Sequence, residues 1–318
     1  MSENTILFPA EMHLREVRKV IHTLNELIEF RGFEHILLDF RNCRTVFPEA
    51  IVPLICVILI RQKEGVRFTL SLPLYERTKR LFLNCSWASF ISPKQFSSST
   101  HPVGDNIPLV RFSDQSEQDR ITNSILDMLL RALSFVTRDD LRALEWSVNE
   151  ICDNVLNHAQ SDIGGVFQFS FRRFSREVEF IVADGGIGIP KSLRSLRNKD
   201  WSDEFALEQS IKQGVTRDPQ FGQGNGLFGT YQIAALSGGT FHINSGSAYL
   251  VVTRRGEVQV RRDPEPFLGT MVVCAINFTR PELLERAVSF KGGSYRMVDW
   301  IETKYEQDEN VIKMVIRD

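Results

Sequence analysis

The sequence has no excess of charge of either sign, and this absence argues against one broad class of function. Lysine and arginine total 38 against 40 aspartate and glutamate residues, which gives a formal net charge of -2 over 318 residues. Proteins whose main partner is nucleic acid usually present a strongly positive field. The composition therefore carries no clear nucleic-acid signature.

Cysteine is scarce and widely spaced. The five cysteines form no CxxC pair, so the spacing predicts neither a zinc site nor a disulfide framework. A reducing, cytoplasmic location fits this usage best. The cysteines are Cys43, Cys56, Cys85, Cys152 and Cys274.

Long apolar runs are also missing. The longest, Ala50–Ile60, has 11 residues and is interrupted by Pro53, whereas about 20 apolar residues are needed to cross a bilayer. Residues 1–8 have neither the positive charge nor the apolar segment of a signal peptide. We therefore expect no membrane partner, and we interpret the apolar run as a buried helix.

The chain is otherwise ordinary in composition and long enough for two domains. Residues 36–40 and 66–72 are predicted strands on either side of an apolar helix at 48–62, which makes a βαβ unit with a parallel strand pair. With a preceding amphipathic helix over Met12–Phe30, this pattern predicts an α/β domain over residues 1–93. Residues 94–118 are rich in serine, proline, asparagine and glycine and are predicted to be a linker.

Residues 119–280 are predicted to form an α+β domain, with helices on one face of a mostly antiparallel sheet. The predicted helices cover 119–135 and 138–159, and the predicted strands cover 166–171, 178–183, 240–244, 249–253, 257–261 and 270–278. Residues 281–318 are a C-terminal extension whose strand-like end, 311–316, could join a sheet, pair with another subunit or begin a further element.

The predicted helix ending near Ala159 carries polar residues suited to a magnesium-phosphate site. Glu150, Asn154 and Asn157 fall within about 60° of one another on a regular helix, beside an apolar stripe. An asparagine oxygen can bind a hard cation, and a glutamate can accept a proton from water or a hydroxyl group. Polar residues on the wet side of an amphipathic helix are common, however, so this helix alone does not decide the function.

Two glycine-rich segments follow. The first, Asp184–Gly188, ends a predicted strand; its glycines permit close approach of a flat ligand, and Asp184 offers an acceptor to an exocyclic amine such as adenine N6. The second, Gly222–Gly229, precedes a predicted helix over Thr230–Leu236, where free N–H groups can bind phosphate. Taken singly, the first could be a simple turn, and the second is neither a P-loop nor a dinucleotide fingerprint.

In their order, the segments NEICDNVLNH, DGGIGIP, FGQGNGLFG and the pair Gly269-Thr270 resemble the GHKL superfamily of histidine kinases, anti-sigma-factor kinases, gyrase-type topoisomerases and Hsp90. The resemblance covers residues 119–280. It implies a Bergerat-type α/β sandwich that binds ATP with Mg²⁺.

The same resemblance implies roles for individual residues. Glu150 corresponds to the general base, Asn154 to the magnesium ligand and Asp184 to the adenine-binding carboxylate. Residues 190–221 correspond to the ATP lid, while the roles of Asn157 and His158 stay open. The remaining nucleotide-binding positions are Gly186 and Gly188 at the adenine pocket, Gly222, Gly224 and Gly226 at the phosphates, and Thr270 supporting the adenine-binding acid.

Residues 1–93 resemble, more weakly, a STAS domain, the fold of anti-sigma-factor antagonists. Those antagonists carry a phosphorylatable serine in the loop before the apolar helix. Here the loop Cys43–Glu49 contains only Thr45 as a hydroxyl residue, which argues against a phosphorylation switch and for a fixed scaffold.

We therefore predict an ATP- and Mg²⁺-binding regulator with slow ATPase activity, in which a GHKL domain acts as a switch coupled to a STAS-like domain. A protein serine/threonine kinase of the anti-sigma-factor type, a dimeric clamp ATPase using Lys291, and ATP binding without turnover are the alternatives. No histidine lies between His101 and His158, which argues against self-phosphorylation on histidine. An unidentified protein partner and a homodimer are both compatible with this prediction.

Overall fold

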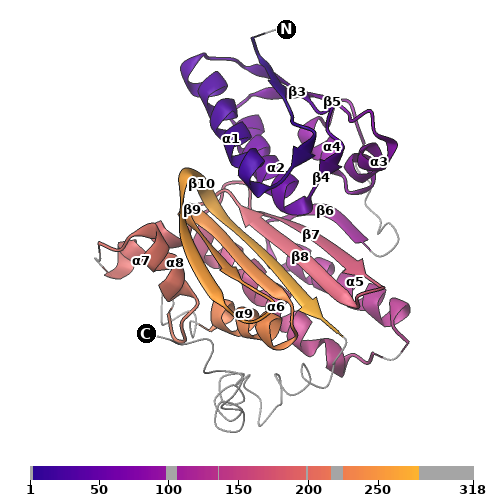
Figure 1. The fold of residues 1–318 in the computed structure, drawn as a ribbon, viewed down its shortest axis with the longest axis vertical. Coiled ribbons are helices and arrows are strands. Elements are labelled where there is room, and N and C mark those ends of the chain that lie inside the picture. Colours follow the sequence, from indigo (N-terminus) through magenta and orange to yellow (C-terminus); the bar gives the residue numbers. More distant parts are fainter. Residues whose placement is uncertain (1–2, 98–105, 135, 198–199, 216–224, 279–318) are drawn as a thin grey trace.

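The computed structural model describes residues 3–97, 106–134, 136–197, 200–215 and 225–278 (Figure 1). Lys291, Gly222, Gly224 and the strand-like segment 311–316 lie outside these residues. Among the described residues, no helix combines the length and the apolar character needed to span a bilayer.

The N-terminal part is an α/β unit built on a parallel three-stranded sheet in the order β1-β3-β5. The predicted βαβ unit is confirmed, because α2 connects the parallel strands β3 and β5. The predicted first helix begins at Leu14 and continues past Asn25 as a π-helical turn, Glu26–Phe30. The elements are β1 (Thr5–Leu7), β2 (Glu11–Met12), α1 (Leu14–Asn25), β3 (His35–Asp39), β4 (Thr45–Val46), α2 (Pro48–Lys63), β5 (Arg67–Ser71), α3 (Glu76–Asn84) and α4 (Trp87–Ile91).

The following part contains a five-stranded antiparallel sheet in the order β6-β7-β8-β10-β9. Strand β6 lies within residues 94–118, which composition predicted to be a linker. Its backbone pairs with β7, so this part of the segment belongs to the sheet. Strands β9 and β10 are each continuous where two short strands were predicted, because bulges between Arg262 and Thr270 let β10 bend without ending. The strands are β6 (Asn106–Phe112), β7 (Gly165–Arg172), β8 (Glu177–Asp184), β9 (Thr240–Val252) and β10 (Val258–Asn277).

Both faces of this sheet are covered, whereas the sequence predicted helices on one face. In β8, Phe180 and Val182 pack among the helices, while the alternate residues Ile181 and Ala183 pack into the N-terminal part. Figure 1 shows the N-terminal part above the sheet and α5, α6 and α9 across its other face. The helices are α5 (Gln115–Ala132), α6 (Arg142–Asn154), α7 (Ile189–Arg197), α8 (Asp203–Ser210) and α9 (Gly226–Leu236).

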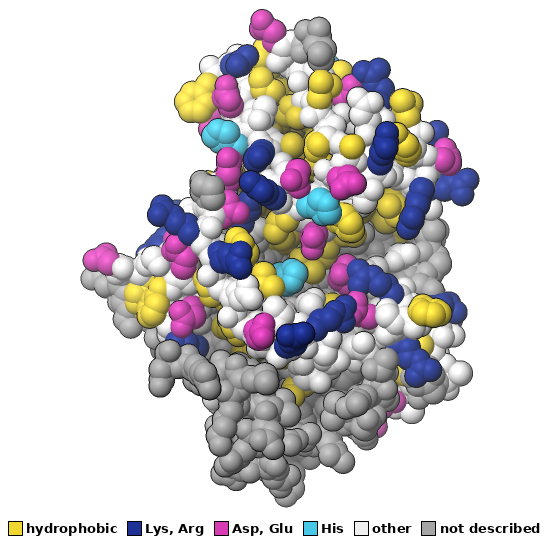
Figure 2. Space-filling model, viewed as in Figure 1, with side chains coloured by type: hydrophobic (Ala, Val, Ile, Leu, Met, Phe, Trp, Pro, Cys, Tyr) yellow, Lys and Arg dark blue, Asp and Glu magenta, His cyan; other side chains and the backbone are white. Residues whose placement is uncertain are grey.

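Burial on two sides explains the composition of α2. Its residues Ala50–Ile58 are all buried, because the helix lies between its own parallel sheet and strands β7, β8 and β10. The molecular surface is mixed by contrast: Figure 2 shows acidic and basic side chains interspersed over the face viewed, as the near-neutral composition predicts.

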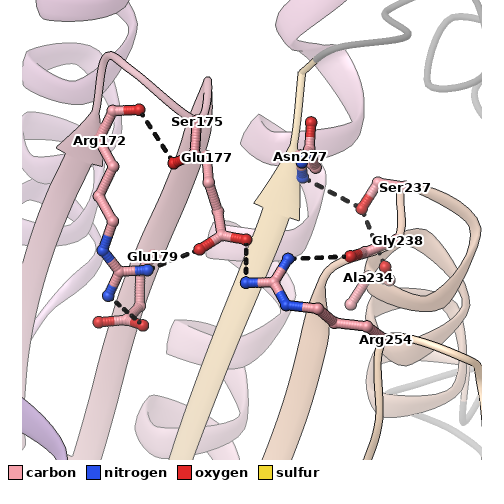
Figure 3. Close-up of polar contacts among 9 residues, drawn as sticks. All are labelled: Arg172, Ser175, Glu177, Glu179, Ala234, Ser237, Gly238, Arg254 and Asn277. Carbon is pink, nitrogen blue, oxygen red and sulfur yellow. Dashed lines mark hydrogen bonds and ion pairs between the residues drawn. The ribbon is translucent and has the colours of Figure 1, made fainter.

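A network of charged side chains links β7, β8 and the turn between β9 and β10 (Figure 3). Arg172 Nη1 lies 2.6 Å from Glu177 Oε1, and its Nη2 lies 2.9 Å from Glu179 Oε2. Arg254 Nη2 lies 2.5 Å from the second oxygen of Glu177, and its Nη1 donates to the carbonyl oxygen of Gly238 at 3.1 Å. Because Glu177 is buried, both arginines are needed to compensate its charge.

We expect Arg254→Ala to lower the free energy of unfolding by about 1–3 kcal/mol, because it leaves one oxygen of the buried Glu177 carboxylate without a cation. Chemical denaturation at low salt measures this change. Arg255→Ala is the matched control, since Arg255 is exposed in the same turn. An equal loss in the two variants would contradict the assigned role of Arg254.

Candidate nucleotide-binding site

Asp184 ends β8 as a buried carboxylate held by backbone amides. Its Oδ1 accepts from the amide of Gly186 at 2.8 Å, and the backbone amide of Thr270 also donates to it. Burial nevertheless raises the pKa of Asp184 to about 7, against the opposite effect of these hydrogen bonds. Gly269 has a φ of +87°, and a Cβ there would collide with the backbone carbonyl of Asp184. The structure thus brings two of the predicted binding residues, Asp184 and Thr270, together.

Ser245 contacts the same group of residues, although no pattern in the sequence selected it. Its buried Oγ accepts from the amide of Ile189 at 2.9 Å, donates to the carbonyl oxygen of Gly269 at 2.7 Å and lies 3.2 Å from Thr270 Oγ1. A Cβ on Gly188, whose φ is +74°, would collide with this hydroxyl group. Ser245 pairs with Thr270 across β9 and β10. This pairing is what marks Ser245 as a site residue, and it becomes visible only in the folded hairpin.

The Asp184 turn docks on the end of the α6 helix. The amide of Ile187 donates to the carbonyl oxygen of Ala159 at 2.8 Å, and a Cβ on Gly186 would collide with that same carbonyl group. The last residues of the helix, Val155–Ala159, form a π-helical turn. This turn changes the angular spacing from that of a regular helix, and Asn157 within it is exposed. The role of Asn157 stays open.

Glu150 lies against the first residue of α9. A Cβ on Gly226 would come 2.5 Å from Glu150 Oε2, so the carboxylate lies directly against the start of this helix and would have to shift if a side chain were present there. Burial, and to a lesser extent Asp153, raise the pKa of Glu150 to about 7. The free N–H groups of a helix start favour an anion such as phosphate. The structure therefore places a carboxylate beside a candidate phosphate site.

Asn154 fits the expected metal ligand by its chemistry, because its carboxamide oxygen is a neutral ligand that Mg²⁺ accepts. It follows Glu150 by one helical turn. Its Nδ2 is buried without a hydrogen-bond partner in the described structure, and this donor suits a phosphate oxygen rather than the cation. Within the described ranges, no group of three or more His, Cys, Asp and Glu side chains is placed to hold a metal ion. A Mg²⁺ ion bound at Asn154 would therefore take most of its ligands from phosphate and water, as this ion commonly does in nucleotide sites.

The described part of the predicted lid is a packed pair of helices. Ser202 caps α8 by accepting from the amide of Phe205, and Leu207 and Ile211 lie in the main core. Asp203 accepts from Arg194 Nη1 at 2.6 Å and from the amide of Ser247 at 2.7 Å, which fastens both helices to β9. Residues 190–215, apart from 198 and 199, thus belong to the body of the domain.

Residues 139–276 match a family model described as "Histidine kinase-, DNA gyrase B-, and HSP90-like ATPase". The match includes every described site residue from Glu150 to Thr270, and it supports the GHKL resemblance of this part of the chain. It indicates a nucleotide-binding domain of the ATPase or kinase type, and such domains bind ATP, typically with Mg²⁺. The match does not extend to residues 1–138, so the STAS resemblance stays a prediction. Comparison with curated proteins gave no significant match.

Proposed function

We propose that this protein binds ATP with Mg²⁺ and hydrolyses it slowly, and that the bound nucleotide acts as a switch coupled to a STAS-like N-terminal domain. One observation supports the proposal most. The Asp184 turn docks on the helix that carries Glu150 and Asn154, and Glu150 in turn abuts the start of α9. These contacts support the proposal that three segments distant in sequence line one site.

Each side chain has a distinct task in this proposal. Asp184 accepts a hydrogen bond from the adenine amino group, and the start of α9 binds phosphate oxygens through its N–H groups. Asn154 holds Mg²⁺, which neutralises phosphate charge when it is bound. Glu150, whose pKa of about 7 leaves it partly ionised near neutral pH, accepts the proton of the attacking water.

Incubation of the whole protein with γ-labelled ATP and Mg²⁺ tests the proposal. Free labelled phosphate is the expected product. Label transferred to a protein side chain would instead favour the kinase of the anti-sigma-factor type, in which Glu150 would act on a hydroxyl group rather than on water. Binding of ATP with neither product would contradict the ATPase, and absence of binding would contradict the whole proposal.

Asn154→Ala is expected to remove most of the contribution of Mg²⁺ to ATP affinity, a loss of about tenfold, because it deletes the only protein ligand proposed for the ion. Titration calorimetry with Mg²⁺ or with EDTA measures this contribution. Asn157→Ala, the exposed asparagine just beyond Asn154, is the matched control and should behave like the wild type. Retention of the full Mg²⁺ effect in Asn154→Ala would contradict the metal role.

We extend the proposal to association. We propose that ATP binding changes the association of this chain, either with a separate protein partner or with a second copy of itself. Sedimentation of the protein with and without ATP distinguishes a nucleotide-dependent dimer from a monomer that acts on a separate partner.

A further inference from the structure

The end of α2 reaches the nucleotide site from the back of the sheet. A Cβ on Gly185 would collide with the Cδ1 atom of Ile60, and would lie 2.9 Å from its Cγ1. One turn further on, Lys63 Nζ donates to the carbonyl oxygen of Asp162 at 2.9 Å. The loop at Asp162 is joined to the Asp184 turn, because Ser161 Oγ accepts from the amide of Gly185 at 3.3 Å.

Gly185 differs from Gly188 and Gly269 in the reason for its identity. Gly188 and Gly269 have positive φ values, which a side chain would strain, whereas the backbone of Gly185 lies outside that region. Alanine is therefore compatible with the Gly185 backbone, and the Ile60 side chain would have to move to make room for its methyl group. The absent side chain allows an N-terminal helix to touch the residue that follows Asp184.

Earlier residues of α2 also lie close to the pocket. Burial, followed by the negative charge of Asp184, raises the pKa of the Cys56 thiol well above its ordinary value. Cys56 precedes Ile60 by one helical turn, so the same side of α2 follows β8 towards its end. Contacts between α2 and β8 are consistent with this placement.

A second connection joins the N-terminal part to the other side of the Asp184 turn. Arg18 of α1 is buried; its Nη1 lies 2.7 Å from Asp263 Oδ2 and donates to the carbonyl oxygen of Glu265 at 2.7 Å. Figure 1 shows α1 above the bend of β10, which lies within the strand and includes Asp263 and Glu265. Strand β10 then continues to Gly269 and Thr270, which contact Asp184 directly.

We propose that the end of α2 holds the purine-binding turn in place, with Ile60 as a positioning residue for nucleotide binding. This inference rests on the proposed function and names the contact through which the two parts of the chain are coupled. Coupling between binding and a second site is reciprocal. A displacement of α2 changes the affinity for ATP, and ATP binding restrains α2.

A rescue experiment on the whole protein tests this contact. Gly185→Ala alone is expected to weaken ATP binding about tenfold, because the new methyl group and Ile60 cannot occupy the same space. Adding Ile60→Ala removes the colliding atoms and is expected to restore most of the affinity. Leu59→Ala in the same Gly185→Ala background is the matched control, since Leu59 is an equally half-buried neighbour on α2, and it should restore nothing.

Hydrogen exchange gives a second readout. It is measured on the wild type, so it tests the contact even if the Gly185→Ala variant does not fold. In the wild type, saturating ATP is expected to slow amide exchange over residues 56–64 as well as over 184–188. ATP binding by the wild type without protection of 56–64, or equal restoration by Ile60→Ala and Leu59→Ala, would overturn the positioning role. Absence of ATP binding by the wild type would instead overturn the proposed function.

Discussion

ATP turnover is expected to fall by a factor of about 10²–10⁴ when Glu150 is replaced by alanine, the range typical for loss of a general base. The carboxylate lies at the start of α9, where the phosphates are proposed to bind, and burial raises its pKa to about 7. It is thus basic enough to accept a proton and still ionised in part at neutral pH. ATP binding should be retained, because the proposed affinity comes from Asp184, Asn154 and the start of α9.

The pH dependence of turnover gives an independent check on Glu150. The general base works only when it is ionised, and its pKa is raised, so the single-turnover rate should rise with pH and level off above about 7. Single-turnover measurements across this range test the chemical step rather than product release. Glu145→Ala, on the same helix, is the control and should keep both rate and profile. A loss of ATP affinity in Glu150→Ala as large as its loss of turnover would contradict the assigned role.

Asp184→Asn is expected to weaken ATP binding by about 10²-fold while stabilising the nucleotide-free protein above neutral pH. Asparagine can accept from the amides of Gly186 and Thr270, but it loses the charge that strengthens a hydrogen bond from the adenine amino group. A hundredfold loss corresponds to about 3 kcal/mol, within the range of charged hydrogen bonds. Titration calorimetry measures the affinity.

The stability effect of Asp184 follows from the direction of its pKa shift. The carboxyl group has a pKa of 3.8 as an isolated group and about 7 in the folded protein, so between these values the folded state keeps a proton that the unfolded state has lost. Stability therefore falls as pH rises through this window, and the penalty reaches at most about 4 kcal/mol above pH 7. Asp184→Asn removes this penalty.

Thermal unfolding of the nucleotide-free protein at pH 5 and pH 8 tests the stability effect. The variant should gain stability over the wild type mainly at pH 8. Asp162→Asn, on the exposed neighbouring loop, is the control and should leave both stability and affinity near wild type. A variant that loses ATP affinity together with stability at both pH values would indicate a merely structural role for Asp184.

Local patterns in the sequence were sufficient to predict the candidate site in part. Glu150 and Asn154 lie one turn apart on a helix, so their common face follows from helix geometry alone, and glycine at 188 reflects a backbone conformation that few other residues adopt. The βαβ unit was predictable for the same reason, because strand and helix periods are local. The π-helical turn after Asn154 is not visible in any such pattern, so the angular position of Asn157 relative to Glu150 and Asn154 does not follow from regular helix spacing.

The contacts between distant segments were decided by the tertiary structure. Strands β7 and β8 contribute buried apolar residues to a core on each face, and composition cannot say whether helices or a second domain cover each face. The long β9–β10 hairpin places Ser245 opposite Thr270, and the packing of α2 places Ile60 against Gly185. Helix and strand propensities act over a few residues, whereas these pairings depend on how whole surfaces fit together. The sequence by itself therefore determined which residues suit the chemistry, and the three-dimensional packing determined which other residues hold them in place.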